Sequence, residues 1–183
     1  MQTTTLTTPD GPFSVVVAAV PAVDRAPAGQ ATEQVLAAGW TDDVGSLLAL
    51  VHPSLRPSAA DRADGEAATG LLAEAADAVR AYYDGDHGAP GHIPVLQASG
   101  PYRTHAWDVL REVEPGERLT YSEYAVRTGR PAAVRAAAGA CAMNAAALFV
   151  PCHRILRTDG TLGGFRYGLP IKESLLAREA PSA

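Results

Sequence analysis

The sequence predicts an α+β protein, with strands in its first half and mostly helices in its second half. Apolar, partly β-branched runs at residues 13–20 and 35–40 are typical of strands. After residue 100, an amphipathic segment is followed by segments with helix-capping and helix-initiating residues. The chain has 183 residues, of which 47% are hydrophobic and 19% charged, and this composition suits one large globular domain or two small ones.

In the first half, the turn dipeptide Asp10-Gly11 precedes the strand at residues 13–20, and residues 35–40 are a plausible partner strand. Residues 41–43 offer an N-cap for a short helix through Val51. These signals predict two paired strands followed by a helix.

The rest of the first half predicts a longer helix and one more strand. Apolar residues fall near helical spacing over residues 66–83. Residues 84–91 are rich in Gly, Asp and Pro and predict a turn or linker, and residues 93–96 predict a short strand. No residue of this half carries a catalytic signature.

The second half predicts a helix-turn-helix. Residues 102–113 are amphipathic, and Thr120 and Glu123 form the pattern of a capping box that opens a helix ending at Gly129. Pro131 suits the first residue of the next helix, which we expect to run to Met143. Two short helices joined by a Gly-containing turn are typical of a DNA-binding unit.

The helix predicted at residues 131–143 consists almost entirely of small residues, and Arg135 is its only charged residue. One interpretation is close approach to a DNA backbone or narrow groove without sequence readout. The alternative is a tightly packed core helix. After this helix, the sequence predicts a hairpin turn at residues 159–160 and a final helix at residues 170–179.

Charge and cysteine content limit the classes of partner. Residues 1–99 hold four Arg and twelve Asp or Glu, a net −8, whereas residues 100–183 hold eleven Arg or Lys and eight Asp or Glu, a net +3. The basic half would meet a polyanion, although ordinary charge scatter also explains so mild an excess. No apolar run is long enough for a membrane span, and no secretory signal is apparent. With two cysteines and no zinc signature, we expect a reduced, cytoplasmic protein.

Cys152 is the candidate nucleophile, flanked by Pro151, His153 and Arg154. A thiol reacts as thiolate, and nearby cations or a proton acceptor raise the thiolate fraction. In an extended strand, Cys152 and His153 would point to opposite faces, so they can cooperate only through a bend at Pro151 or a bridging water. The alternative is a buried structural cysteine.

The segment Val150-Pro-Cys-His-Arg154 resembles the active-site motif of the O6-alkylguanine-DNA alkyltransferases, also called methylated-DNA–protein cysteine methyltransferases. The resemblance covers roughly residues 100–179 without a gap. The matching positions are Trp107, Pro115-Gly116, Thr120-Tyr121, Arg135-Ala136, Asn144, Asp159-Gly160, Leu162-Gly-Gly164, Gly168, Lys172, Leu175-Leu176 and Glu179.

The resemblance implies a small ribonuclease-H-like sheet in an N-terminal supporting domain (residues 1–93), a linker (94–100) and a winged helix-turn-helix-like domain (101–183). The second domain would bind DNA and accept the alkyl group. By the same resemblance, Cys152 would take the alkyl group from guanine O6 once and irreversibly. His153, linked to Cys152 by water and oriented by Glu179, would take up the thiol proton.

The remaining site residues follow from the same resemblance. Asn144 would stabilise the turn and hydrogen-bond near the sulfur. Tyr121 and Arg135, with the adjoining Ser122 and Ala136, would act on the DNA while the target base is flipped out. The substrate pocket would be formed by Leu162, Phe165 and Arg166.

The chain departs from the family pattern at three positions. Ala145 stands where the family usually has Pro, Phe165 where many members have Tyr, and Arg166 where some have a small polar residue. These differences leave open how tightly the turn is held and how large an alkyl group fits.

The resemblance also sets the expected ligands and partners. We expect no cofactor, because the lesion itself donates the alkyl group, and no structural zinc, because the first domain has no cysteine. The expected partner is double-stranded DNA containing O6-alkylguanine, chiefly O6-methylguanine. We expect a monomer away from membranes, and we leave open cooperative binding on DNA and activity on O4-methylthymine. A non-repairing sensor of alkylated DNA and a cysteine hydrolase are the competing functions.

Overall fold

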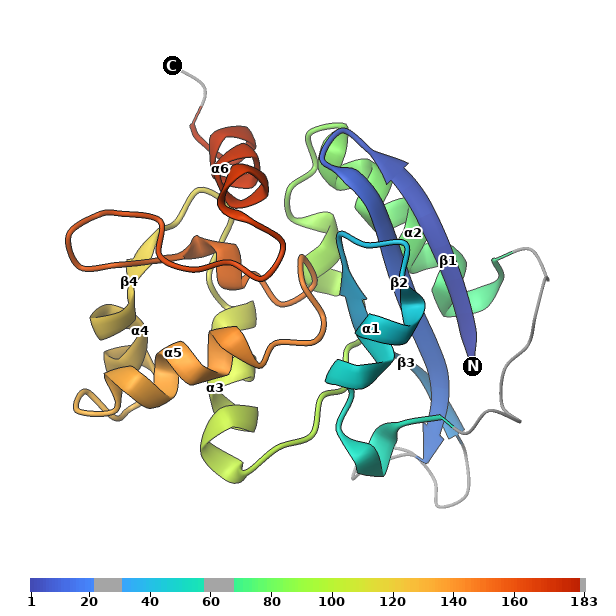
Figure 1. The fold of residues 1–183 in the computed structure, drawn as a ribbon, viewed down its shortest axis with the longest axis horizontal. Helices are drawn as coiled ribbons and strands as arrows, with labels where there is room; N and C mark the ends of the chain where they lie inside the picture. The colour runs from blue at the N-terminus through green and yellow to red at the C-terminus, as the bar shows by residue number, and fades with distance from the viewer. Residues whose placement is uncertain (22–30, 58–67, 182–183) are drawn as a thin grey trace.

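The protein's structure is a computed structural model that describes residues 1–21, 31–57 and 68–181. Figure 1 shows a part built around a sheet beside a part built mainly of helices, so the predicted α+β class is confirmed. The first part contains β1 (Gln2–Thr8), β2 (Gly11–Pro21), β3 (Ala31–Gly39), α1 (Val44–Leu50), η1 (Pro53–Leu55), α2 (Gly70–Tyr83) and η3 (Ala89–His92). The second contains α3 (Pro101–Arg111), β4 (Leu119–Thr120), α4 (Tyr121–Arg127), α5 (Val134–Ala142), η4 (Cys152–Arg154), β5 (Ile155–Leu156) and α6 (Leu169–Arg178).

The three long strands form an antiparallel sheet in the order β1-β2-β3. The predicted strands at residues 13–20 and 35–40 correspond to β2 and β3, but the sequence analysis missed β1. The Asp10-Gly11 turn connects β1 to β2, and Gly11 has a φ of +110°, a conformation open to glycine. β1 is a Thr-rich edge strand in which only Leu6 is fully buried, so its apolar signal is weak.

Both faces of this sheet are covered, which explains why β2 is an almost continuous apolar run. On one face, Val15 and Val17 pack in a core with Leu72 and Val79 of α2. On the other face, a second cluster brings Val16, Leu36 and Ala37 of the sheet together with Leu47 and Leu48 of α1.

Two predictions for the first half need correction. Ala68 and Thr69, inside the helix predicted at residues 66–83, are not helical, and α2 begins at Gly70, whereas residues 66–67 lie outside the described residues. The predicted strand at residues 93–96 is only a single parallel bridge between Val95 and Val35. The Val35 amide donates to Pro94 O and the Leu96 amide donates to Val35 O, whereas Pro94 has no N–H with which to extend the pairing.

In the second part, α3, α4 and α5 pack together beneath the short parallel pair β4-β5 (Figure 1). Trp107 Nε1 on α3 donates to Ala140 O on α5 at 2.9 Å. At the start of α4, Thr120 and Glu123 form the predicted capping box through reciprocal side-chain hydrogen bonds. The Trp107 hydrogen bond holds α5 against α3, and the capping box fixes where α4 begins.

The predicted start of α5 is wrong by three residues. Pro131 lies in a turn in which the Ala133 amide donates to Arg130 O at 2.8 Å, and the helix begins at Val134. Pro131 is the second residue of this four-residue turn, a position that its fixed φ suits as well as the first turn of a helix. The sequence alone therefore does not separate the two placements.

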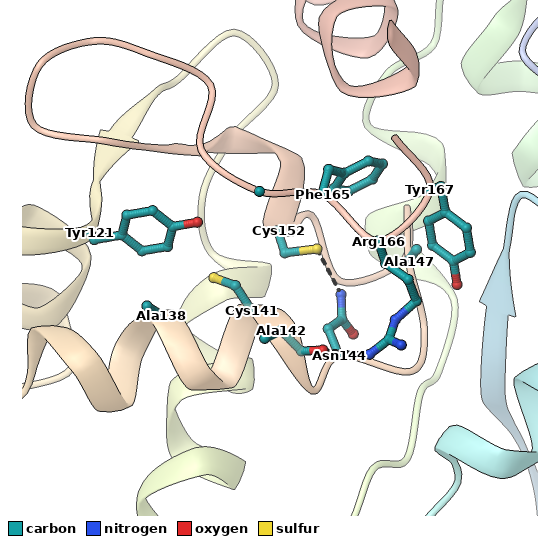
Figure 2. Close-up of a pocket in the computed structure, with 11 residues that line it drawn as sticks. Tyr121, Ala138, Cys141, Ala142, Asn144, Ala147, Cys152, Phe165, Arg166 and Tyr167 are labelled. Atoms are coloured by element: carbon teal, nitrogen blue, oxygen red, sulfur yellow. Dashed lines mark hydrogen bonds between the residues drawn. The ribbon is translucent and has the colours of Figure 1, made fainter. Parts of the chain in front are cut away.

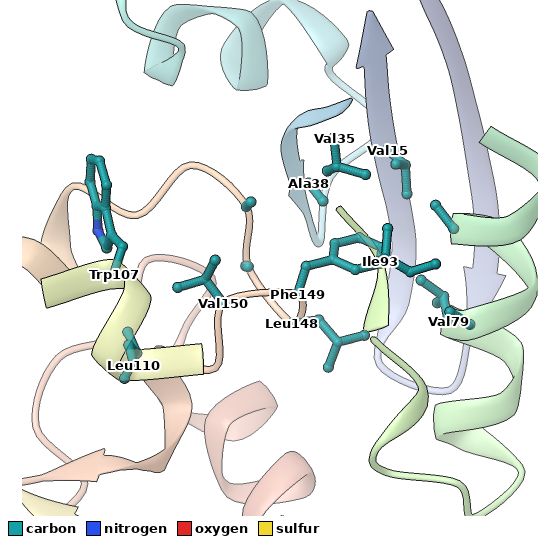
Figure 3. Close-up of a cluster of buried hydrophobic side chains, with 14 of the residues drawn as sticks. Val15, Val35, Ala38, Val79, Ile93, Trp107, Leu110, Leu148, Phe149 and Val150 are labelled. Atoms are coloured by element: carbon teal, nitrogen blue, oxygen red, sulfur yellow. The ribbon is translucent and has the colours of Figure 1, made fainter. Parts of the chain in front are cut away.

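The chain between α5 and Cys152 packs against both parts. The Ala38 amide donates to Ala145 O at 2.8 Å, and the Ala147 amide donates to Ala38 O at 2.9 Å. Figure 3 shows Phe149 beside the sheet residues Val15 and Val35, whereas Val150 lies toward Trp107 of α3. Sheet and helices therefore share one apolar core immediately before Cys152.

Candidate active site

Cys152 begins a single turn of 3-10 helix, η4, that directly follows Pro151. The turn replaces the extended conformation that would have placed Cys152 and His153 on opposite faces. Cys152 is half-buried and faces a cavity, whereas His153 is buried. Leu148, four residues before Cys152, has a φ of +72°. The chain just before Cys152 therefore carries backbone strain of a kind that often marks functional sites.

The cavity beside Cys152 has a volume of about 360 Å³ (Figure 2). Tyr121 stands at one end, and Cys141 comes from α5 beside small side chains such as Ala138. Phe165 and Tyr167 contribute aromatic rings. The lining is mostly apolar with a few polar groups, as in sites for small organic molecules.

Asn144 makes the direct polar contact with the Cys152 sulfur. Its Nδ2 donates to Sγ at 3.2 Å, shown dashed in Figure 2, and to Val150 O at 2.8 Å. Its Oδ1 accepts a hydrogen bond from the Ala146 amide at 3.1 Å, so a backbone group fixes which end of the side-chain amide faces the sulfur. A donor at this position stabilises a thiolate.

Burial raises the pKa of the Cys152 thiol, while the hydrogen bond from Asn144 and the charge of Lys172 act in the opposite direction. Lys172 is buried and donates through Nζ to Ile155 O at 2.6 Å. Because burial outweighs these two effects, the thiol stays mostly protonated at neutral pH. A reaction at Sγ therefore needs a nearby proton acceptor.

His153 is suited to accept that proton. Its Nε2 lies 2.9 Å from Glu179 Oε1, and because a carboxylate only accepts, we assign the ring hydrogen to Nε2. Burial lowers the pKa of His153 despite the hydrogen bond with Glu179, so the ring is neutral near pH 7. Within the described residues, the buried Nδ1 has no hydrogen-bond partner and no hydrogen bond joins the ring to Cys152. Nδ1 is thus a free acceptor that a water molecule could link to the thiol.

Glu179 is held by further donors that the sequence analysis missed. Arg154 donates from Nε to Oε2 at 2.8 Å and from Nη2 to Oε1 at 2.9 Å, and Tyr82 donates to Oε1 at 2.9 Å. Burial by itself would raise the pKa of Glu179, but the hydrogen bonds from His153 and Arg154 and the charge of Arg154 hold it well below its usual range. The carboxylate is therefore ionised at neutral pH and can orient the imidazole.

Of the three residues expected to form the substrate pocket, two line the cavity and one does not. Phe165 and Arg166 line the cavity, and Arg166 Nη2 donates to Ala142 O at the end of α5. Leu162 is not among the lining residues, and its carbonyl accepts a hydrogen bond from Lys172 Nζ. Tyr167 was not predicted, yet its ring lines the cavity and fills the space where a Cβ on Gly39 would lie.

The expected DNA-facing residues lie on α4 and α5. Tyr121 and Ser122, the first residues of α4, are half-buried, and the Tyr121 ring faces the cavity (Figure 2). Arg135 and Ala136 are exposed near the start of α5. The structure thus places an exposed arginine near the start of the helix of small residues, and Ala138, Cys141 and Ala142 of the same helix line the cavity beside Cys152.

Comparison with known proteins relates the second part of the chain to a DNA repair family. Residues 101–181 match the family described as "6-O-methylguanine DNA methyltransferase, DNA binding domain", which confirms the resemblance found in the sequence. Over 91 residues the chain is 47% identical to the bifunctional transcriptional activator/DNA repair enzyme Ada of Escherichia coli, and these residues make up 50% of this chain and 26% of Ada. Over 98 residues it is 41% identical to the methylated-DNA–protein-cysteine methyltransferase of Haemophilus influenzae, and this alignment covers 54% of this chain and 55% of that protein.

A solved structure matches the whole chain. The structure of Mycobacterium tuberculosis OGT in complex with DNA aligns with a TM-score of 0.67 and 22% identity, and the match covers 100% of this chain and 96% of that one. This match extends the shared fold to the N-terminal sheet. The sequence alignments span about a quarter of Ada and about half of the H. influenzae protein.

In the described residues, no helix is both long and apolar enough to cross a membrane.

Proposed function

We propose that the protein repairs O6-alkylguanine in double-stranded DNA, because residues 101–181 match the family described as "6-O-methylguanine DNA methyltransferase, DNA binding domain". The alkyl group, chiefly methyl, is transferred to Cys152. The observation that carries this proposal is the Cys152 sulfur, which faces a cavity, accepts a hydrogen bond from Asn144 and adjoins the buried His153–Glu179 pair.

The reaction is a direct displacement. As the thiol is deprotonated, its proton passes through water to the free Nδ1 of His153, and Glu179 stabilises the imidazolium that forms. Cys152 Sγ then bonds to the alkyl carbon as the bond between that carbon and guanine O6 breaks. The electron pair of the broken bond goes to O6, the guanine takes up a proton from water, and the imidazolium of His153 returns its proton to water.

The product is a thioether on Cys152, which has no good leaving group. Each molecule therefore reacts once, and the lesion supplies the alkyl group without a methyl-donor cofactor. The Glu179 contacts explain why Arg154 follows His153 in the motif, because its guanidinium holds the carboxylate that orients the ring.

The exposed face of α5 approaches the minor groove of DNA, because its small side chains permit close contact with the duplex. Guanine O6 faces the major groove. A protein bound in the minor groove can therefore reach it only if the target nucleotide rotates out, and Arg135 fills the gap that the nucleotide leaves. Tyr121, at the cavity end, presses on the phosphate next to the target nucleotide. Ser122 and Ala136 lie against the same backbone.

The proposal assigns residues 1–93 to support of the site, residues 94–100 to a linker and residues 101–183 to DNA binding and alkyl transfer. The protein acts as a monomer in the cytoplasm, where a lone reactive thiol stays reduced.

Incubation with duplex DNA carrying one O6-methylguanine, followed by peptide mapping, tests the proposal. We expect methylated Cys152 in the wild type and in Cys141→Ala, the matched removal of the other cysteine. Cys152→Ala should bind the duplex without accepting a methyl group. A wild-type protein that binds the lesion without transfer would instead be a damage sensor, and continued turnover of an ester would indicate a cysteine hydrolase.

A further inference from the structure

Gln97 lies outside the motif that carries the family resemblance, yet it contacts Asn144, the residue that donates to the sulfur. Gln97 Nε2 donates to Asn144 Oδ1 at 3.0 Å. Gln97 Oε1 accepts a hydrogen bond from the Ala145 amide at 2.7 Å. Gln97 is half-buried, and both residues that it contacts are buried.

Backbone groups fix the orientation of both side-chain amides. The Ala145 N–H can only donate, so the Gln97 atom facing it is the oxygen, and Nε2 faces Asn144. The Ala146 N–H likewise identifies Asn144 Oδ1, and the carbonyl of Val150 identifies Nδ2. The hydrogen bonds therefore form one directed chain from Ala145 through Gln97 and Asn144 to Cys152 Sγ.

Ala145 gives this chain of hydrogen bonds its first donor. The related family usually has Pro at this position, and Pro has no N–H. In this protein the free amide of Ala145 holds Gln97 in place. The same substitution that removes the rigidity of Pro thus supplies the hydrogen bond that anchors a polar side chain beside Asn144.

We propose that Gln97 is a positioning residue for Cys152, acting through Asn144. By donating to Oδ1, Gln97 polarises the Asn144 amide and strengthens its Nδ2–H bond to the sulfur, since linked hydrogen bonds reinforce one another. A stronger donor favours the thiolate. The role of Gln97 in alkyl transfer rests on the proposed function, whereas its effect on the Cys152 thiol does not.

The thiol can be measured without any DNA. In a Cys141→Ala background, Cys152 is the single cysteine of the chain. Its rate of reaction with iodoacetamide across neutral and alkaline pH gives the thiolate fraction directly. We compare this parent with Gln97→Leu, which removes both the hydrogen-bond donor and the acceptor of the side chain, and with Gln97→Glu. The ionised Glu side chain still accepts from Ala145 but cannot donate to Asn144.

We expect both variants to react roughly three- to tenfold more slowly than the parent at neutral pH, the effect of one lost hydrogen bond. The deficit should shrink as the pH rises, because the apparent pKa of Cys152 has increased. Gln34→Leu is the matched control, since Gln34 lies on β3 and its Nε2 donates to Thr32 Oγ1, away from Cys152 along the chain. This control should react like the parent at every pH.

A Gln97→Glu variant with the parent's pH profile would overturn the proposal, because Gln97 would then only hold the Ala145 backbone. The proposal would also be overturned if Gln97→Leu reacted more slowly than the parent by the same factor at every pH. Gln97→Glu keeps an acceptor for the buried Ala145 amide, so it decides the question if Gln97→Leu does not fold. The proposed function is tested separately by methyl transfer to the wild type, and its failure would leave the thiol profiles unchanged.

Discussion

Tyr82 donates a hydrogen bond to Glu179 Oε1 at 2.9 Å, and both side chains are buried. Tyr82 lies on α2, which covers the N-terminal sheet, whereas Glu179 directly follows the last residue of α6. Burial and the negative charge of Glu179 raise the pKa of Tyr82, so the phenol keeps its hydrogen and acts as a donor. A residue of the N-terminal part thus helps to hold the carboxylate that orients His153.

Tyr82→Phe removes this donor with little change in volume. Because a hydrogen bond to a charged group contributes about 1.5–3 kcal/mol, the free energy of unfolding should fall by about that amount. Denaturant titration measures the loss. In Tyr102→Phe, the matched variant, the lost hydrogen bond joins Tyr102 to the neutral Thr128, so we expect a smaller loss of about 0.5–1.5 kcal/mol. Equal losses in the two variants would show that the charge of Glu179 adds nothing to this contact.

Glu179→Gln should slow methyl transfer at neutral pH, because the imidazolium of His153 loses its anionic partner. Raising the pH should recover part of the rate. The Cys152 pKa lies above its ordinary value. As long as the pH is below that pKa, each one-unit rise in pH gives about ten times more thiolate without help from the relay. Single-turnover rates across pH measure the effect, with Glu173→Gln on the exposed side of α6 as the control. A rate equal to wild type at every pH would limit Glu179 to a structural role.

Arg135→Ala should slow repair of a duplex roughly ten- to a hundredfold, because unstacking a base costs a few kcal/mol that Arg135 partly offsets. Reaction with free O6-benzylguanine, provided the cavity admits it, should change much less, since a free base needs no unstacking. Arg135→Lys should recover only part of the duplex rate, because Lys lacks the planar group that stacks.

Arg80→Ala is the matched control for Arg135→Ala, since Arg80 is an exposed arginine on α2. It should leave the duplex rate unchanged. Equal losses on duplex and free base in Arg135→Ala would mean that Arg135 supports the fold of the domain and does not fill the stack.

Local signals predicted much of the fold. The α1 N-cap at Asp43 and the capping box at Thr120 depend on neighbouring residues, and both are present in the structure. β1 was missed because its threonines lack the apolar alternation of a half-buried strand. The start of α5 was misplaced because Pro131 suits a turn and a helix start equally well.

The candidate site was only partly predictable. Cys152, His153 and Asn144 lie within one short stretch that carries a recognisable motif, so sequence reasoning found them. Tyr82 is 97 residues from Glu179 along the chain, and Gln97 is 47 residues from Asn144. Contacts over such separations depend on how α2 and the segment before α3 pack against the second half of the chain, which no local pattern encodes.

The stoichiometry of transfer tests the central claim most directly. Intact-mass analysis of the wild-type protein, after incubation with excess duplex containing O6-methylguanine, should show a gain of one methyl group and no more. The group should lie on Cys152, although Cys141 lines the same cavity, because burial raises the pKa of Cys141 well above its ordinary value and because His153 directly follows Cys152. Repair that continues beyond one equivalent, or a methyl group found on Cys141, would contradict the account.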